Sequence, residues 1–265
     1  MTPPAPAVLS IERDRREVAW RVLEGGAVIG SSRALSRPDR RCFVSIDTWR
    51  TEVFDLLLQT MSDELEENLF TTVDEADGGR LEQWSASGFT VNRSEHEYLI
   101  PTEPEATGLR GATTPPGIDV VSAARVAVAG LRRLDEELRT DVPGSDGWIN
   151  DPQEFREYTF DPRHFDPATY LVAVDQTSGD LLGLARVWND RRFPRLGLIG
   201  VSRGHRRRGL ARALLAAAFL PLHQRGVHEI SAEADATNAP SITLLGSLGA
   251  RRTGGSVELL RHRPS

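Results

Sequence analysis

The residues best suited to chemistry lie in the second half of the chain, in the segment Arg206-Arg207-Arg208-Gly209-Leu210-Ala211. The segment follows an apolar run at 196–201, which predicts a strand, and precedes an alanine- and leucine-rich run at 210–224, which predicts a helix. Glycine lets the backbone approach an anion, a helix start offers free N–H groups, and arginine donates charge-assisted hydrogen bonds to phosphate oxygens. The sequence therefore predicts a diphosphate site here.

The positive charge around this segment is local. Residues 1–110 hold 12 arginines against 20 acidic residues, and residues 111–265 hold 20 against 18, so the whole chain carries −6. Five arginines with no acidic residue among them fall in one short stretch: Arg203, Arg206, Arg207, Arg208 and Arg212. Such a cluster also suits a solvated helix face or a nucleic-acid patch. The glycines and the strand-to-helix context favour phosphate, and the overall acidity argues against nucleic acid.

Composition excludes several classes of protein. The 32 basic residues are all arginine, so a Walker phosphate loop, a Schiff-base lysine and a kinase-type strand lysine are impossible. The single cysteine, Cys42, excludes an intramolecular disulfide and a multi-cysteine metal site, and we expect no metal. The N-terminus has no signal-peptide pattern and no apolar run is long enough to span a bilayer, so we predict a cytoplasmic protein without membrane partners.

The segment 100–117, with four prolines and three glycines, has linker composition. We predict a first domain at 1–105, a linker at 106–117 and a second domain at 118–265. Periodicity predicts helices at 51–65, 79–87, 122–140, 152–158, 210–224 and 240–248. It predicts strands at 17–22, 27–35, 41–47, 69–73, 89–99, 170–175, 181–188, 195–201, 229–234 and 257–261.

Both parts share the order strands, helix, strand, helix, strand, which suggests an internal duplication. Their closing stretches, 81–89 and 242–250, each read as an apolar helix ended by glycine, at Gly88 and Gly249. We therefore predict an α/β fold (an α+β mixed sheet) with two domains, each a central mixed, mostly antiparallel sheet flanked by helices.

The pattern Arg206-x-x-Gly209-x-Ala211 resembles the GNAT superfamily of N-acetyltransferases, whose acetyl-CoA loop follows Gln/Arg-x-x-Gly-x-Gly/Ala. Three neighbouring features strengthen the resemblance: Val201 before the loop, the helix after it, and Asn238 followed by Leu248-Gly249-Ala250. The resemblance covers most of residues 120–262. It implies two GNAT-like domains of the tandem type, with acetyl-CoA (CoA) as cofactor.

The resemblance also implies which residues contact acetyl-CoA. Backbone N–H groups of the loop would bind the pyrophosphate, and those near the end of the preceding strand would bind pantetheine and the thioester carbonyl, where an amide stabilises the oxyanion of acyl transfer. The implied cofactor-binding residues are Ile199, Gly200, Val201, Arg206, Arg207, Arg208, Gly209, Leu210, Ala211 and Asn238.

Two positions depart from the family pattern. A proline common after Val201 is replaced by Arg203, a change that we expect to be harmless. The family often places a tyrosine seven residues after the asparagine as general acid for the departing thiolate, and this chain has Leu245 there. Leucine cannot donate a proton, so either Ser241 or Ser247 serves, or water does, or the domain does not catalyse acetyl transfer in the usual way.

The general base is equally open. Glu233 and Asp235 flank the end of the strand that precedes Asn238, and His205 lies beside the loop. We take Glu233 and Ser241 as the candidate catalytic residues and expect His205 to pack against the loop.

The acceptor would contact the segment that follows the first helix of the second domain. There Asp141, Asp146 and Trp148 suit a cationic, amine-bearing small molecule through charge and aromatic contact. A loop of capped turns with a core tryptophan explains the same residues.

In the first part, the stretch equivalent to the phosphate loop is Ser45–Arg50, which has no glycine and contains Asp47. A carboxylate there would repel pyrophosphate. We predict that this half is a degenerate copy that binds no CoA and instead completes the substrate cleft or packs against the active half.

We therefore expect an acyltransferase that moves an acetyl group from acetyl-CoA to a primary amine of an antibiotic-like or biosynthetic small molecule, by direct attack in a ternary complex. The alternatives are a non-catalytic CoA-binding sensor or pseudoenzyme, and thiol-metabolite acetylation of the mycothiol-synthase type. Both a monomer and a homodimer remain open.

Overall fold

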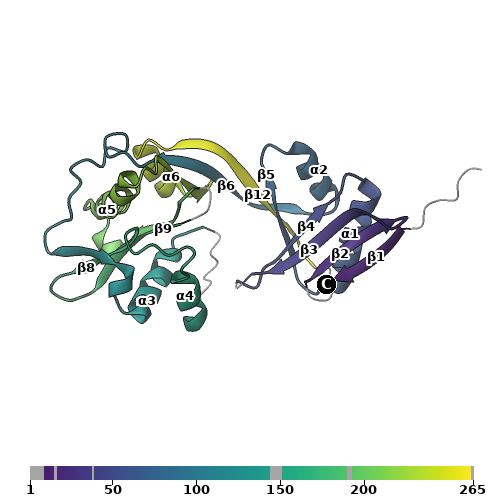
Figure 1. Cartoon of the computed structure of the whole chain (residues 1–265), viewed down its shortest axis with the longest axis horizontal. Coiled ribbons are helices and arrows are strands. Elements are labelled where there is room, and N and C mark those ends of the chain that lie inside the picture. The colour runs from purple at the N-terminus through teal and green to yellow at the C-terminus, as the bar shows by residue number, and fades with distance from the viewer. Residues whose placement is uncertain (1–8, 15–16, 38, 144–150, 190–192, 264–265) are drawn as a thin grey trace, which may run out of the picture. The chain divides into compact units, whose positions relative to one another are not determined.

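A computed structural model of the chain describes residues 9–14, 17–37, 39–143, 151–189 and 193–263. The chain forms two compact units: unit 1 comprises 1–93 and 256–265, and unit 2 comprises 94–255. Figure 1 labels their helices and strands. No helix in the described part of the chain is long and apolar enough to cross a membrane.

Unit 1 contains a mixed sheet in the order β1-β2-β3-β4-β5-β12. Neighbours in it are antiparallel except β4 and β5, which run parallel and pair only at Cys42 with Leu69 and Phe43 with Phe70. The strands are β1 (Leu9–Asp14), β2 (Ala19–Glu24), β3 (Ala27–Ser36), β4 (Cys42–Asp47), β5 (Leu69–Asp74) and the closing part of β12 (Arg251–Arg261). The helices are α1 (Thr51–Glu64) and α2 (Gly78–Ala86).

Helix α1 covers the sheet of unit 1 with the apolar face that its periodicity predicts. Val53, Leu57 and Met61, spaced four apart, are fully buried. From α2, Trp84 packs edge-to-face between Phe54 and Phe89 at ring-centroid distances of 4.9 and 4.7 Å. These contacts give unit 1 a core of its own.

Unit 2 repeats this plan in the sheet order β6-β11-β10-β9-β8-β7. Only β10 and β11 are parallel, and they too pair at just two positions, Arg195 with Ser231 and Leu196 with Ala232. Its strands are β6 (Thr90–Pro101), β7 (Ile118–Ser122), β8 (Tyr170–Asp175), β9 (Leu181–Trp188), β10 (Arg195–Val201) and β11 (Glu229–Asp235). Its helices are α3 (Val128–Arg139), α4 (Pro152–Thr159), α5 (Leu210–Gln224) and α6 (Ala239–Ser247). Both units therefore have the predicted architecture, a mixed and mostly antiparallel sheet flanked by helices.

Helices cover both faces of the unit 2 sheet, α3 and α4 on one face and α5 and α6 on the other (Figure 1). Because side chains alternate along a strand, the two faces have separate cores. Leu184 and Leu198 join the core under α3 and α4, whereas Leu182 and Leu196 join the core under α5.

The compact units do not coincide with the division predicted at residues 105 and 118. Residues 95–101 of β6 pair with β11 in unit 2, and residues 256–261 of β12 pair with β5 in unit 1. Each unit is thus closed by a strand that composition alone assigns to the other half. The proline-rich segment is also packed: Thr107 and Leu109 are buried, and Arg212 of α5 donates to the carbonyl of Gly108.

Two strands and one helix start differ from the sequence expectation. Strand β1 was not predicted because its run LSIERD is mostly polar and exposed. The helix expected from Ser122 begins at Val128 instead, because 118–122 forms β7 and the Ser122 side chain accepts from Ala124 N–H to start a separate 3-10 turn.

Candidate functional site

The strands β10 and β11 diverge over most of their length. Their parallel pairing ends at Leu196, although β10 continues to Val201 and β11 to Asp235. Beyond Leu196 the pairing of β10 is with β9 only. Backbone groups on the β11 side of β10 are therefore available to a ligand inserted between the two strands.

A β-bulge lies where the divergence begins. The register of β10 against β9 shifts between Leu196 and Leu198, and a Cβ added to Gly197 would lie 2.3 Å from Trp188 Nε1. Only glycine therefore fits under the indole. Neither Gly197 nor Trp188 was assigned a role from sequence, although a glycine inside a strand pattern is a known signal for a bulge.

The loop 202–209 has a conformation that exposes backbone to a ligand. Arg207 (φ 62°) and Gly209 (φ 82°) both adopt left-handed backbone conformations. No atom lies within 4 Å of a Cβ added at Gly204 or Gly209, so the space beside the backbone is open. Left-handed residues interrupt the helical path and turn successive N–H groups toward one concave side, a geometry that binds anions.

Helix α5 begins without a side-chain cap. Its N-cap is Gly209, and no side chain accepts from the first-turn N–H groups. In the same unit, Asp151 and Asn238 cap α4 and α6, whereas α3, like α5, has no side-chain cap. The first N–H groups of α5, from Leu210 onward, are thus left for an anionic ligand, together with the positive end of the helix dipole.

Two arginines of the loop are tied to a carboxylate. Asp141 accepts from Arg203 Nη2 at 2.6 Å and from Arg206 Nη2 at 2.5 Å. Arg206 Nε also donates to the carbonyl of Val201 at 2.8 Å, which closes the base of the loop. Hydrogen bonds from Arg203 and Arg206 lower the pKa of Asp141 from 3.8 to about 2.

The other loop arginines do not take part in this cluster. Arg207 and Arg208 are exposed and form no ion pair with any residue that the structure describes. The structure thus brings together the predicted cofactor residues at the end of β10, the loop and the start of α5. Within β10, Gly200 packs against Leu138 of α3, since a Cβ there would lie 2.9 Å from Leu138 Cδ1.

Helix α6 and its N-cap hold four residues named from the sequence, in different settings. Asn238 caps the helix by accepting from Ser241 N–H at 3.1 Å. Ser241 is half-buried beside it, whereas the Ser247 hydroxyl donates to the Leu244 carbonyl. Leu245 is 4% exposed and belongs to the core of unit 2. At the position where the family often has tyrosine, this chain therefore has a leucine that packs in the core.

Carboxylates face one side of β11 and β6. Cross-strand pairing joins Glu233 to Glu97 and Asp235 to Glu95. The alternate residues Ala232, Ala234 and Tyr98 pack in the core under α5 and α6, so the acidic side chains occupy the opposite face. Glu233 is exposed and pairs with Arg195 at 2.5 Å, and Asp235 accepts from Thr237.

The predicted acceptor residues fall in two groups. Asp141 contacts the loop arginines, as described, and Asp146 and Trp148 lie outside the described residues. His205 lies in the short 3-10 turn of the loop, as expected for a packed residue, and its Nδ1 is buried. The described part of the chain contains no cluster of three or more His, Cys, Asp or Glu that could hold a metal.

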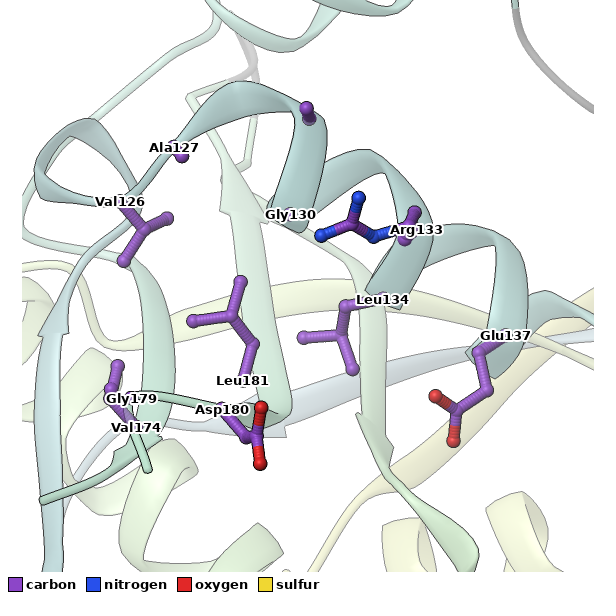
Figure 2. A pocket seen from close by; sticks show the side chains of 11 residues that line it. Val126, Ala127, Gly130, Arg133, Leu134, Glu137, Val174, Gly179, Asp180 and Leu181 are labelled. Carbon is purple, nitrogen blue, oxygen red and sulfur yellow. The ribbon is translucent and has the colours of Figure 1, made fainter. Parts of the chain in front are cut away.

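A second hollow of about 690 Å³ lies between α3 and the turn that joins β8 to β9 (Figure 2). Val126, Leu134 and Leu181 form its apolar floor, and Glu137 lies on its rim. The carboxylate of Glu137 also contributes, after that of Asp141, to the raised pKa of Arg203. This hollow is therefore a neighbour of the loop and not part of the divergence between β10 and β11.

Comparison with known proteins finds a family match for the segment that contains this site. Residues 131–250 match the profile described as Acetyltransferase (GNAT) family. No curated protein shows significant sequence similarity to the chain.

Several solved structures share the fold along both units. A GCN5-related N-acetyltransferase from Sphaerobacter thermophilus aligns with a TM-score of 0.72 at 20% identity, over 93% of this chain and 81% of that one. A tandem GNAT protein from the clavulanic acid biosynthesis pathway aligns with a TM-score of 0.71 at 16% identity, over 98% and 85%. A GCN5-related N-acetyltransferase from Kribbella flavida gives 0.57 at 14% identity, over 92% and 87%.

Proposed function

We propose that unit 2 transfers an acetyl group from acetyl-CoA to a primary amine of a small molecule, since residues 131–250 match the model of the GNAT acetyltransferase family. The observation that carries this proposal is the uncapped start of α5 behind a loop with two left-handed residues, at the end of a strand that diverges from its parallel neighbour. These residues fit a diphosphate followed by an extended arm.

The proposed division of roles follows the order of the chain. N–H groups of 206–211 bind the diphosphate, and Arg207 and Arg208 contact its oxygens. The unpaired edge of β10, from Ile199 to Val201, binds the extended arm, and Asn238 lines it from α6. An N–H on this edge stabilises the negative charge that develops on the carbonyl oxygen during transfer.

The acidic face of β11 and β6 supports an amine as acceptor. Like charges on directly opposite strand positions destabilise a sheet, and a cation placed between them removes that cost. Glu233 on β11 and Glu97 opposite it on β6 lie on the face away from α5, where their carboxylates would hold a cationic molecule. This arrangement favours an acceptor with more than one positive charge.

When bound, acetyl-CoA supplies the activated acyl group. The acceptor nitrogen forms the new bond to the carbonyl carbon as the bond to sulfur breaks, so one proton leaves the amine and one joins the thiolate. Glu233, which is exposed on β11 beside the gap between β10 and β11, would accept the proton that leaves the amine. Ser241 or water would donate the proton that joins the thiolate, since Leu245 has no proton to give.

A second candidate function is a CoA-binding sensor without catalysis. The burial of Leu245 and the ion pair that holds Glu233 to Arg195 favour it, because both reduce the supply of acid and base near the cleft. The two functions share the cofactor site and differ only in turnover.

Release of free CoA distinguishes them. The protein is incubated with acetyl-CoA and a panel of mono-, di- and polyamines, and free thiol is followed over time. The enzyme proposal expects thiol release with at least one amine, preferentially a polycation, and a loss of about 100-fold in kcat/KM for Glu233→Gln. Tight CoA binding without turnover on any amine would establish the sensor instead.

A further inference from the structure

Asp141 follows α3 directly and faces the loop. Sequence reasoning groups it with residues for the acceptor, but both of its carboxylate oxygens are engaged by guanidinium groups of the loop. Its side chain is partly exposed, so its partners and not burial fix its direction. Hydrogen bonds from Arg203 and Arg206 lower its pKa from 3.8 to about 2, so the carboxylate keeps its charge even in mildly acidic solution.

The hydrogen bonds of the two arginines show what Asp141 does to the loop. Arg206 spans from the Val201 carbonyl to Asp141, so its guanidinium joins the end of β10 to the end of α3. Arg203 reaches the same carboxylate through Nε and Nη2, at 3.5 and 2.6 Å. Donors that could serve a phosphate are therefore used to attach the loop to the framework of unit 2.

The charge of Asp141 also stabilises the loop. Arginines at 203, 206, 207, 208 and 212 crowd like charges into one loop and the helix turn behind it, and their mutual repulsion favours an open, disordered loop. One carboxylate between Arg203 and Arg206 offsets part of that repulsion. Arg207 and Arg208, which have no ion pair among the described residues, keep their donors for a ligand.

We propose that Asp141 is a positioning residue of the diphosphate site. Its carboxylate binds Arg203 and Arg206, so the loop keeps the conformation that exposes its backbone N–H groups even before the cofactor binds. Arg207 and Arg208 then remain to contact the phosphates. The role in cofactor binding rests on the proposed function above, whereas the order of the free loop does not.

The test compares Asp141→Asn, which removes the charge at nearly constant size, with Asp141→Glu, which restores it. Hydrogen exchange of the amides at 203–209 is measured in the free protein, and dissociation constants are measured for CoA and for acetyl-pantetheine, which lacks the diphosphate. Glu105→Gln is the matched control, because it removes another exposed ion pair of unit 2, the one with Arg110, and leaves the ion pairs of Arg203 and Arg206 in place.

We expect faster exchange of the loop amides in Asp141→Asn and CoA binding weaker by about tenfold, the size that two exposed ion pairs support. Binding of acetyl-pantetheine should stay at the wild-type value, and Asp141→Glu should recover most of the CoA affinity. Glu105→Gln should match wild type in all three measurements.

Unchanged loop exchange in Asp141→Asn would overturn the inference whether or not the wild type binds CoA. Equal weakening of CoA and acetyl-pantetheine would also overturn it, since that result means a general disturbance of unit 2. A wild-type protein that binds no CoA, with loop exchange still faster in Asp141→Asn, would reject the proposed function and the cofactor role but keep Asp141 as the residue that orders the loop.

Discussion

The two units have the same strand order but differ in the loop that leads from β4 to α1 in unit 1 and from β10 to α5 in unit 2. In unit 2 the chain passes from β10 to α5 through residues 202–209, with left-handed residues at 207 and 209. In unit 1 it passes from β4 to α1 through 48–50 alone, and Arg50, the residue before α1, is extended. The short connection cannot fold its amides around an anion.

The same two places differ in how an arginine is used. In unit 2, Arg206 within the loop donates to Val201, the last residue of β10. In unit 1, Arg80 of α2 donates to the Ile46 carbonyl near the end of β4 at 2.9 Å, so a helix residue caps the strand end that a ligand would approach. The exposed Asp47 lies beside it, 3.9 Å from Arg80 Nη2, so unit 1 has a carboxylate at a place where the loop of unit 2 has none.

One position is alike in both units. Trp84 of α2 and Leu245 of α6 occupy matching places in the two closing helices, and both are buried in the core of their own unit. Two sheets of the same strand order thus keep this packing position, whereas the capacity to bind an anion depends on loop length and backbone conformation.

The largest expected effect is the loss of CoA binding in Gly209→Glu. A carboxylate at the start of α5 repels the diphosphate, and a side chain at φ 82° costs about 1–2 kcal/mol in backbone strain. Isothermal titration should detect no binding. The matched control is Trp49→Glu, which places the same charge on an 81% exposed side chain in the short loop of unit 1 and should leave the affinity unchanged. Undiminished affinity in Gly209→Glu would reject the cofactor site.

Leu259→Ala is expected to destabilise unit 1 without changing the cofactor site of unit 2. Leu259 lies in the part of β12 that follows unit 2 in sequence and is fully buried in the core of unit 1, so its truncation should lower the free energy of unfolding of unit 1 by about 2–5 kcal/mol. The readout is alkylation of Cys42, since desolvation raises the pKa of this buried thiol to about 11 and keeps it unreactive until unit 1 opens. CoA affinity should stay constant, and a parallel loss of affinity would contradict the assignment of β12.

Leu245→Tyr is expected to destabilise unit 2 and not to rescue catalysis. Tyrosine is larger than leucine and brings a hydroxyl into a packed core, which costs about 1–3 kcal/mol. Urea denaturation measures the loss, and thiol release in the amine assay measures turnover. A faster variant of normal stability would show that the side chain reaches the cleft.

The smallest effect concerns pH. The lowered pKa of Asp141 means that its contribution is fully present above its ordinary value of 3.8 and is lost as pH falls toward about 2. The difference in stability between wild type and Asp141→Asn should therefore be constant from pH 8 to pH 5 and shrink below about pH 4. A difference that changes between pH 8 and pH 6 would assign the effect to another group.

The sequence predicted the repeated architecture well because its signals are local. Residues 206–211 combine a glycine, arginines and a helix start in one stretch, and α1 shows its buried face through the spacing of Val53, Leu57 and Met61. These patterns depend on neighbours within a few turns, which a single sequence displays directly.

The closing strands and the role of Asp141 could not be predicted in this way. β6 and β12 have ordinary strand patterns, and nothing within either run specifies which sheet it joins, because partner choice depends on contacts far away in sequence. Asp141 pairs with arginines more than 60 residues away, and its sequence neighbours do not show these partners. The composition of its own segment therefore suggested a contact with the acceptor. Gly197 gave a local signal, but its meaning depended on Trp188 across the sheet.

The placement of β12 has a consequence for the order of folding during synthesis. Unit 2 has all six strands of its sheet once residue 235 has been made, since β6 precedes the others. Unit 1 has its first five strands by residue 74 but must wait for residues 256–261 to cover the edge of β5. The half that leaves the ribosome first thus completes its sheet last, with an unpaired strand edge in the interval and a closure that joins segments nearly the whole chain apart.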